Sequence, residues 1–167
     1  MHVSETALQI LGLDYVWWLV SPQNPLKLKA AMGELETRVA AAREFARHPR
    51  IIVTDIEKEL GTIYTSDTLK ALLQRFPTAH FVWLMGSDNL IQIPQWRCWR
   101  RIFAMVPVAV VSRPETSLKA RNGKAAKMFS AARAPADDLF AARRPPALTT
   151  IETRHDWTSA TEIRARL

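Results

Sequence analysis

The chain has 167 residues, of which 48% are hydrophobic and 23% charged. This length suits one globular domain, and the composition excludes a disordered or fibrous chain. The longest apolar runs are far too short to cross a bilayer, and no basic-then-apolar signal segment opens the sequence, so we expect neither. The one cysteine, Cys98, can form no internal disulfide, which favours a reducing, cytoplasmic setting.

Basic residues outnumber acidic ones by 23 to 16, which gives a formal net charge of +7. Such an excess favours an anionic ligand, and nucleotides and nucleic acids both qualify. Much of it lies in residues 119–144, where a solvated surface is the simpler interpretation. We expect no nucleic-acid partner, because the chain carries no helix-turn-helix, zinc-finger or RNA-binding signature.

The predicted elements alternate along the chain. Residues 3–12 have apolar positions at helical spacing, and Gly12 is placed to end that helix. The continuous apolar run at residues 15–20 is typical of a strand covered on both faces. Further strands are expected at residues 51–54, 80–85, 107–111 and 148–152. Further helices are expected at residues 35–47, 65–76, 96–105 and 159–167.

This alternation predicts an α/β fold with a mainly parallel sheet. No repeat or shift in composition marks a boundary, so we expect a single domain over residues 1–167. One feature is unusual, because a doubly wound domain begins with a strand whose following turn binds phosphate, whereas this chain opens into a helix. Either the phosphate site is built differently, or that strand and turn are absent from this chain.

Residues 86–89 (GSDN) follow the predicted strand at residues 80–85. Ligands of open α/β sheets bind at the carboxyl ends of the strands. There, Gly86 would let a ligand approach the backbone, and the Asp88 carboxylate could bind ribose hydroxyls. An ordinary turn in which Asp88 caps a helix explains the same residues equally well.

Two other groups of residues also have two interpretations. Ser159 and Thr161 open the last predicted helix, where hydroxyls and free amides suit phosphate oxygens, and Arg164 could add a forked contact. Plain helix capping accounts for them too.

Trp96 and Trp99 lie three residues apart, which favours two core residues, although Trp96 could instead stack on a planar ring. The scattered histidines have no metal-ligand spacing, so we expect no built-in metal site.

Taken together, these segments resemble the bacterial nicotinate-nucleotide adenylyltransferases. Each stretch is short, and their order and spacing over nearly the whole chain carry the resemblance. The stretches are residues 18–27 (WLVSPQNPLK), 55–57 (DIE), 64–69 (YTSDTL), 83–90 (WLMGSDNL) followed by Trp96, 112–114 (SRP) and 159–164 (SATEIR).

The resemblance implies a Rossmann-like nucleotidyltransferase fold. It also implies an activity in NAD biosynthesis: transfer of the adenylyl group of ATP to nicotinate mononucleotide, with Mg²⁺, to give deamido-NAD and pyrophosphate. The implied sites are Gly86, Asp88, Ser159 and Thr161 for ATP, Thr65 and Trp96 for nicotinate mononucleotide, and Lys27 and Arg164 as catalytic groups at the phosphates.

One departure from the family pattern is the absence of its Gly-Ser/Thr-Phe-Asn/Asp-Pro-x-His-x-Gly-His motif, which forms the first strand's turn. We therefore expect the first strand and its phosphate-binding turn to be missing, with Met1 a misplaced start or the gene truncated. We also expect an open edge beside residues 15–20 and low activity of this short form. The alternatives are an impaired nucleotide-binding remnant and an adenylyltransferase for another phosphorylated acceptor, such as phosphopantetheine; Thr65 and Trp96 favour a pyridine ring.

Overall fold

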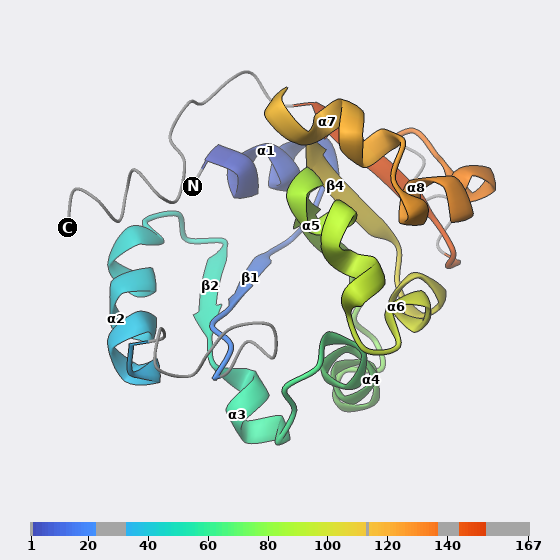
Figure 1. Cartoon of the computed structure of the whole chain (residues 1–167). Helices are drawn as coiled ribbons and strands as arrows, with labels where there is room; N and C mark the ends of the chain where they lie inside the picture. Colours follow the sequence, from blue (N-terminus) through green and yellow to red (C-terminus); the bar gives the residue numbers. More distant parts are fainter. Residues whose placement is uncertain (1, 23–32, 113, 137–143, 153–167) are drawn as a thin grey trace.

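Helices and parallel strands alternate through the chain (Figure 1). The computed structural model describes residues 2–22, 33–112, 114–136 and 144–152. The strands are β1 (Val16–Leu19), β2 (Ile51–Thr54), β3 (Trp83–Gly86), β4 (Val108–Ser112) and β5 (Leu148–Glu152). The α-helices are α1 (His2–Ile10), α2 (Leu35–Phe45), α3 (Ile56–Leu60), α4 (Thr65–Arg75), α5 (Ser87–Gln92), α6 (Trp99–Met105), α7 (Pro114–Arg121) and α8 (Lys124–Met128). The short 3₁₀ helices are η2 (Ile93–Gln95) and η3 (Ser130–Ala132).

The described strands form two parallel sheets. In the first, β1 pairs with β2, with Val16 opposite Ile51. In the second, β4 lies between β3 and β5, and Gly86 of β3 stands opposite Val111. Because every pair is parallel and the connections carry helices, the predicted α/β class with a mainly parallel sheet is confirmed.

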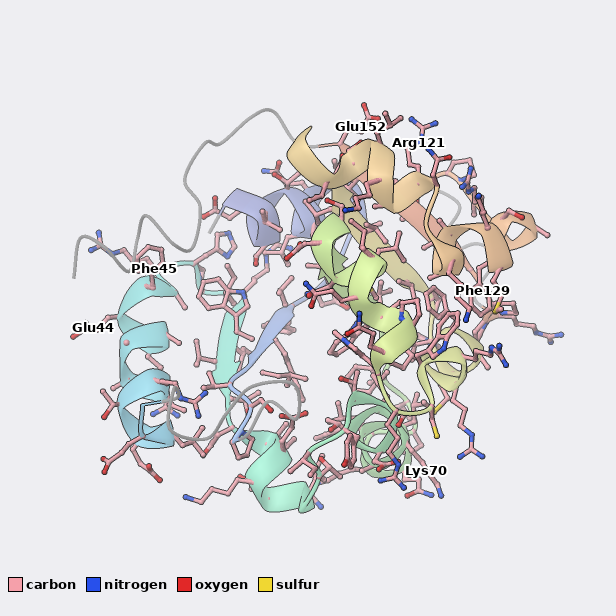
Figure 2. The ribbon with its side chains drawn as sticks, in the orientation of Figure 1. Glu44, Phe45, Lys70, Arg121, Phe129 and Glu152 are labelled. Atoms are coloured by element: carbon pink, nitrogen blue, oxygen red, sulfur yellow. The ribbon has the colours of Figure 1, made fainter. Side chains whose placement is uncertain are left out.

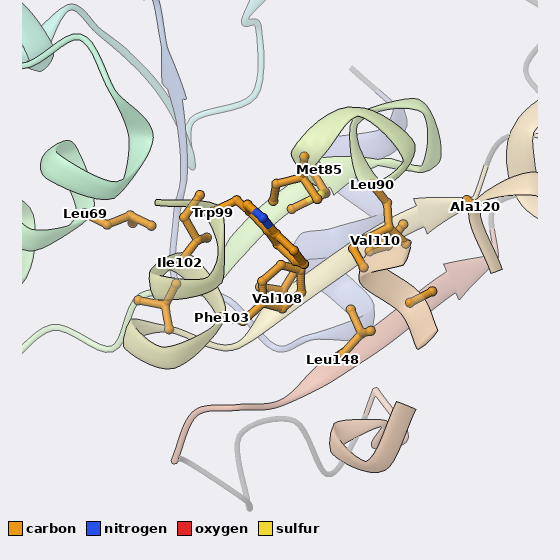
Figure 3. Close-up of a cluster of buried hydrophobic side chains, with 14 residues drawn as sticks. Leu69, Met85, Leu90, Trp99, Ile102, Phe103, Val108, Val110, Ala120 and Leu148 are labelled. Carbon is orange, nitrogen blue, oxygen red and sulfur yellow. The ribbon is translucent and has the colours of Figure 1, made fainter. Parts of the chain in front are cut away.

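The main core is built on β4, whose first four residues are buried. Val108 and Val110 face a cluster that includes residues of α5, α6 and α8, as Figure 3 shows for Trp99 and Phe103 of α6. The Phe103 and Phe129 rings stack with centroids 4.1 Å apart, which fixes α6 against the end of α8. Ala109 faces the opposite side and packs with a second cluster. The continuous apolar run of this strand therefore reports a strand covered on both faces.

Helix α1 connects the two sheets through its buried residues. Ala7 and Leu11 pack in one cluster with Ala109 of β4, whereas Leu8 packs with Val16 and Ile51 of the first sheet. The helix ends at Ile10, two residues before Gly12, whose φ of 58° is the left-handed conformation that glycine adopts without strain and that turns the chain away, as predicted.

Strand β1 is less buried than its sequence predicts. Only Val16 is buried, and residues 17–19 are half-buried. Both faces have packing partners, since Trp17 contacts the rings of Phe76 and Phe81 and Trp18 packs with the cluster around Leu8, so the expected cover is present but incomplete. Among the described residues, β1 pairs only with β2, and its other edge carries no strand. The open edge that we expected beside this strand is therefore present in the described part of the chain.

The predicted helix at residues 96–105 begins later than expected. Backbone at Trp96 is extended, and Cys98 has a φ of 51°, so α6 starts only at Trp99. Trp99 is buried in the main core, and Trp96, outside the helix, is half-buried and packs against the same core. Short helix α3, directly after β2, was not predicted. The helix expected at residues 159–167 lies outside the described residues.

Candidate active site

The helices that follow β3 and β4, α5 and α7, are joined by a hydrogen bond at the carboxyl edge of the second sheet. Gly86 ends β3 and occupies the N-cap position of α5. Ser87, which is 1% exposed, has its hydroxyl oxygen 2.6 Å from that of Thr116 in α7. This bond fixes the start of α5, and with it Asp88, against the helix that follows the neighbouring strand.

Asp88 lies half-buried in the first turn of α5. The N-cap position belongs to Gly86, so the alternative in which Asp88 itself caps the helix is not what the structure has. A carboxylate in a first turn interacts favourably with the positive end of the helix dipole. The two ends of this motif, glycine and carboxylate, thus sit where the sheet edge and a helix N-terminus meet.

Thr65 is the first residue of α4, and a chain of hydroxyl groups supports the backbone around it. Thr68 donates to Glu57 Oε1 at 2.9 Å, and its hydroxyl oxygen lies 2.9 Å from that of Thr62. The backbone amide of Thr68 also donates to the Tyr64 carbonyl at 3.0 Å. Since Thr68 is fully buried and Glu57 is 7% exposed, this network rigidly connects α3, the following turn and the start of α4.

The segments that carry Thr65 and Trp96 are held together through the residues next to them. The Arg97 guanidinium lies over the Tyr64 ring, 4.7 Å from its centroid, and its Nη1 is 3.6 Å from Asp67 Oδ2. Helices α4 and α6 pack on each other beside these contacts. The structure therefore brings together the two segments whose residues we expected to hold one ring.

Arg38 of α2 braces the two ends of the segment that contains Lys27. Its Nη1 and Nη2 donate to the carbonyls of Ser21 and Pro22 at 2.9 and 3.4 Å, and its Nε donates to the Gly33 carbonyl at 3.0 Å. Lys27 itself lies outside the described residues. So do three other residues predicted for the site, Ser159, Thr161 and Arg164.

The basic segment at residues 119–144 is solvent-exposed, as expected, at all its described lysines and arginines. Figure 2 shows Arg121 on α7, far from Lys70 on α4.

On the other side of the molecule, Lys58 donates to Glu36 Oε1 at 3.0 Å. A backbone hydrogen bond at Glu36, and then the Lys58 ammonium, hold the pKa of this exposed carboxyl below its ordinary value.

Sequence analysis missed several residues that organise this edge. Glu57 stands in the stretch 55–57, which carries part of the resemblance but gives this residue no role, and the spacing of 57, 62 and 68 matches no periodic pattern. Arg97 gave no signal beyond its position next to Trp96. Within the described ranges, no three histidine, cysteine or acidic side chains gather as a metal site would require. No described helix is long and apolar enough to span a membrane.

The fold and sequence match nucleotidyltransferases. A family model described as cytidylyltransferase-like matches residues 1–166. Among solved structures, a Plasmodium falciparum nicotinic acid mononucleotide adenylyltransferase complexed with APC has a TM-score of 0.66 and 14% sequence identity, covering 98% of this chain and 73% of that one. These likenesses define the class of the protein as a cytidylyltransferase-like α/β domain.

More similar relatives narrow the class. A protein of Parvibaculum lavamentivorans, described as a probable nicotinate-nucleotide adenylyltransferase, is 51% identical over 99% of this chain and 84% of its own length. Similarly described proteins of Cereibacter sphaeroides and Methylorubrum extorquens are 48% and 45% identical over 99% of this chain, and over 88% and 91% of their own lengths. The chain belongs to the family of bacterial nicotinate-nucleotide adenylyltransferases.

Proposed function

We propose that this protein transfers the adenylyl group of ATP to nicotinate mononucleotide in NAD biosynthesis, forming deamido-NAD and pyrophosphate. The observation that carries the proposal is the identity of 51% over 99% of the chain to a relative described by that activity. We further propose that residues 1–167 act as one nucleotidyltransferase domain, and we place the reaction in the cytoplasm, the reducing compartment that the cysteine content favours.

The chemistry asks for positioning and charge stabilisation rather than for a protein nucleophile. A phosphate oxygen of nicotinate mononucleotide attacks the α-phosphorus of ATP. The bond from that phosphorus to the bridging oxygen then breaks, and pyrophosphate leaves with that oxygen. Aligned reactants and cationic or dipolar groups around the developing charge supply most of the catalysis in such transfers.

The proposed roles divide between the two substrates. Gly86 and Asp88 hold the ribose region of ATP, at an edge where the bond between Ser87 and Thr116 fixes the backbone. Thr65 donates to the carboxylate of the pyridine ring, and Trp96 stacks on that ring. Around the phosphates, Ser159 and Thr161 bind ATP, and Lys27 and Arg164 neutralise the charge that develops.

Magnesium enters this proposal as part of the substrate. Mg²⁺ in such reactions is commonly held by the phosphates of the nucleotide and one or two carboxylates, and keeps several waters. The ion neutralises charge on the ATP phosphates, and the protein residues orient the complex. Removing Mg²⁺ with a chelator is therefore expected to abolish transfer without unfolding the protein.

The experiment that tests the proposal is pyrophosphate release from ATP and Mg²⁺ with three acceptors in parallel: nicotinate mononucleotide, nicotinamide mononucleotide and phosphopantetheine. We expect release above the ATP-only background with nicotinate mononucleotide, and a product with the mass of deamido-NAD. Release with phosphopantetheine but with neither mononucleotide would mean that phosphopantetheine is the acceptor. Binding of ATP without pyrophosphate release for any acceptor would mean that the chain is an impaired remnant that binds nucleotide.

A further inference from the structure

Arg97 lies between the two segments proposed to hold the acceptor ring. Its guanidinium covers the Tyr64 ring at 4.7 Å, and Tyr64 directly precedes Thr65. Along its own chain, Arg97 directly follows Trp96. The Arg97 side chain is 59% exposed, so most of its five N–H donors remain open to solvent or to a ligand.

The Asp67 carboxylate places a negative charge close to Thr65, and the Arg97 guanidinium offsets that charge. The Asp67 carboxylate belongs to the first turn of α4, two residues after Thr65, and its Oδ2 is 3.6 Å from Arg97 Nη1. An unbalanced carboxylate beside Thr65 would repel an acidic ring substituent, and like charges within several ångströms are costly even near a surface. Arg97 cancels that charge while its remaining donors stay available.

Two nearby cations, Lys70 of α4 and Arg100 of α6, do not make this contact with Tyr64 and Asp67. Lys70 lies one turn further along α4 and is exposed. The Arg100 guanidinium lies over the ring of Trp99, 5.6 Å from its centroid. Arg97 is thus the cation whose contacts reach the residues on both sides of Thr65, which are Tyr64 and Asp67.

We propose that Arg97 offsets the Asp67 carboxylate beside the acceptor ring and thereby maintains the preference for an acidic over an amide pyridine ring, which makes Arg97 a specificity-determining residue. The inference rests on the proposed function, since nicotinate mononucleotide and nicotinamide mononucleotide differ only in a carboxylate against a neutral amide. A nearby guanidinium without a partner strengthens binding of a carboxylate, and a nearby aspartate without a partner weakens it. Neither charge changes binding of the neutral amide much. Arg97 therefore acts on acceptor choice and not on the phosphate transfer itself.

The test is a double-mutant cycle read as the ratio of kcat/KM for nicotinate mononucleotide to that for nicotinamide mononucleotide. Arg97→Gln should lower this ratio about three- to tenfold, the range that one charge at roughly 6 Å gives at a well-solvated site with an effective dielectric of about 40 to 80. Asp67→Asn should raise it, and the double variant should return close to the unsubstituted protein. The matched control is Arg100→Gln, which removes the same charge three residues further along the chain, in α6, and should leave the ratio unchanged.

Equilibrium binding keeps the result independent of turnover. Calorimetric affinities for the two mononucleotides should shift by the same factors, and the shifts should shrink in high salt, which screens exposed charges. An unchanged ratio in Arg97→Gln, with binding to nicotinate mononucleotide intact, would overturn the role of Arg97 and leave the proposed function standing. If the unsubstituted protein neither binds nor adenylylates nicotinate mononucleotide, both proposals fail together. Thermal unfolding of each variant identifies any loss that comes from misfolding.

Discussion

Glu57 is a buried carboxylate that sets the direction of the hydrogen bonds around it. The single hydroxyl hydrogen of Thr68 points to Glu57 Oε1, at 2.9 Å. Thr62 must then be the donor in its 2.9 Å contact with the Thr68 oxygen. The second oxygen, Oε2, is buried with no hydrogen-bond partner in the described structure. Removing the Glu57 acceptor would leave the buried Thr68 hydroxyl with only its longer contact to the Tyr64 carbonyl, at 3.2 Å, and a weakened hydrogen bond in the interior is costly.

We therefore expect Glu57→Ala to destabilise the protein by about 2–3 kcal/mol, whereas Glu57→Gln, which keeps an acceptor oxygen, should cost less than about 1 kcal/mol. Urea unfolding measures both. The matched control is Glu59→Ala on the same short helix, where the side chain is exposed and the change should stay within about 0.5 kcal/mol. Equal losses for Glu57→Ala and Glu59→Ala would mean that the hydroxyl network contributes little.

Trp96 carries the stacking role in the proposed acceptor site. Trp96→Ala should weaken binding of nicotinate mononucleotide by about 1–3 kcal/mol, the scale of stacking between a base and an aromatic side chain, and Trp96→Phe should retain most of the affinity. Titration calorimetry with nicotinate mononucleotide measures this. Trp96 also packs against the main core, so unfolding of each variant must be followed in parallel. An affinity unchanged in Trp96→Ala would refute the stacking role.

Single residues show what sequence could and could not predict about the site. Gly86, Asp88, Thr65 and Trp96 could be picked out because each lies in a short stretch with a recognisable order. Their partners could not, since the contact of Arg97 with Asp67 joins residues 30 positions apart through the packing of α4 on α6. Such contacts depend on tertiary structure, which no local pattern encodes.

At the scale of elements, Arg38 uses one planar group to tie α2 to both ends of the segment between Pro22 and Gly33. Three N–H groups of the guanidinium point to three backbone carbonyls, at 2.9 to 3.4 Å. This fork geometry is specific to arginine, because the lysine ammonium is a compact point charge on a flexible stem. The brace therefore depends on shape as well as on charge.

Arg38→Gln is expected to lower the free energy of unfolding by about 1–2 kcal/mol, since it removes bonds from a charged donor to two part-buried carbonyls and one exposed carbonyl. Arg38→Lys should lose nearly as much, and Arg43→Gln on the exposed side of the same helix should have little effect. Chemical denaturation of the three variants measures the loss in free energy of unfolding for each. Full stability of Arg38→Lys would show that charge alone suffices.

Two of the five strands were predicted in full, whereas β3 begins at Trp83, three residues later than expected, and includes Gly86. Strands β2 and β5 match their predicted ranges residue for residue, because runs of β-branched and apolar residues mark them. The start of α6 was wrong because Cys98 adopts a left-handed conformation that is rare for residues other than glycine. No periodicity of apolar residues reports such a backbone turn.

At the scale of the whole molecule, burial is unevenly divided between the two sheets. Strand β4 is covered on both faces and paired on both edges, whereas β1 and β3 each pair on one edge only within the described chain. Sequence predicted the strands and their parallel class, and the resemblance predicted the open edge. The actual burial of β1 could not be read from its apolar run, because that burial depends on what lies beside the strand.

The open edges make a residue-level prediction for amide hydrogen exchange. The Val16 and Val20 amides donate to carbonyls of the β2 chain, and alternation along a strand turns the amides of Trp17 and Leu19 to the other edge. By the same alternation, Trp83 donates to the Pro107 carbonyl beside β4, and the Leu84 amide faces away from β4. Amides without a strand partner exchange through small local openings, whereas those of a central strand need near-global unfolding.

We therefore expect the amides of Trp17, Leu19 and Leu84 to exchange at least about 100-fold faster than those of Val110 and its β4 neighbours, with Val16 and Val20 between these extremes. Residue-resolved exchange followed by NMR at constant pH and temperature measures this, and the β4 amides of the same sample serve as the internal reference. Protection of Trp17, Leu19 and Leu84 equal to that of β4 would mean that another strand covers both edges in solution. The two sheets would then form one continuous sheet, and the open edge of β1 would be absent in solution.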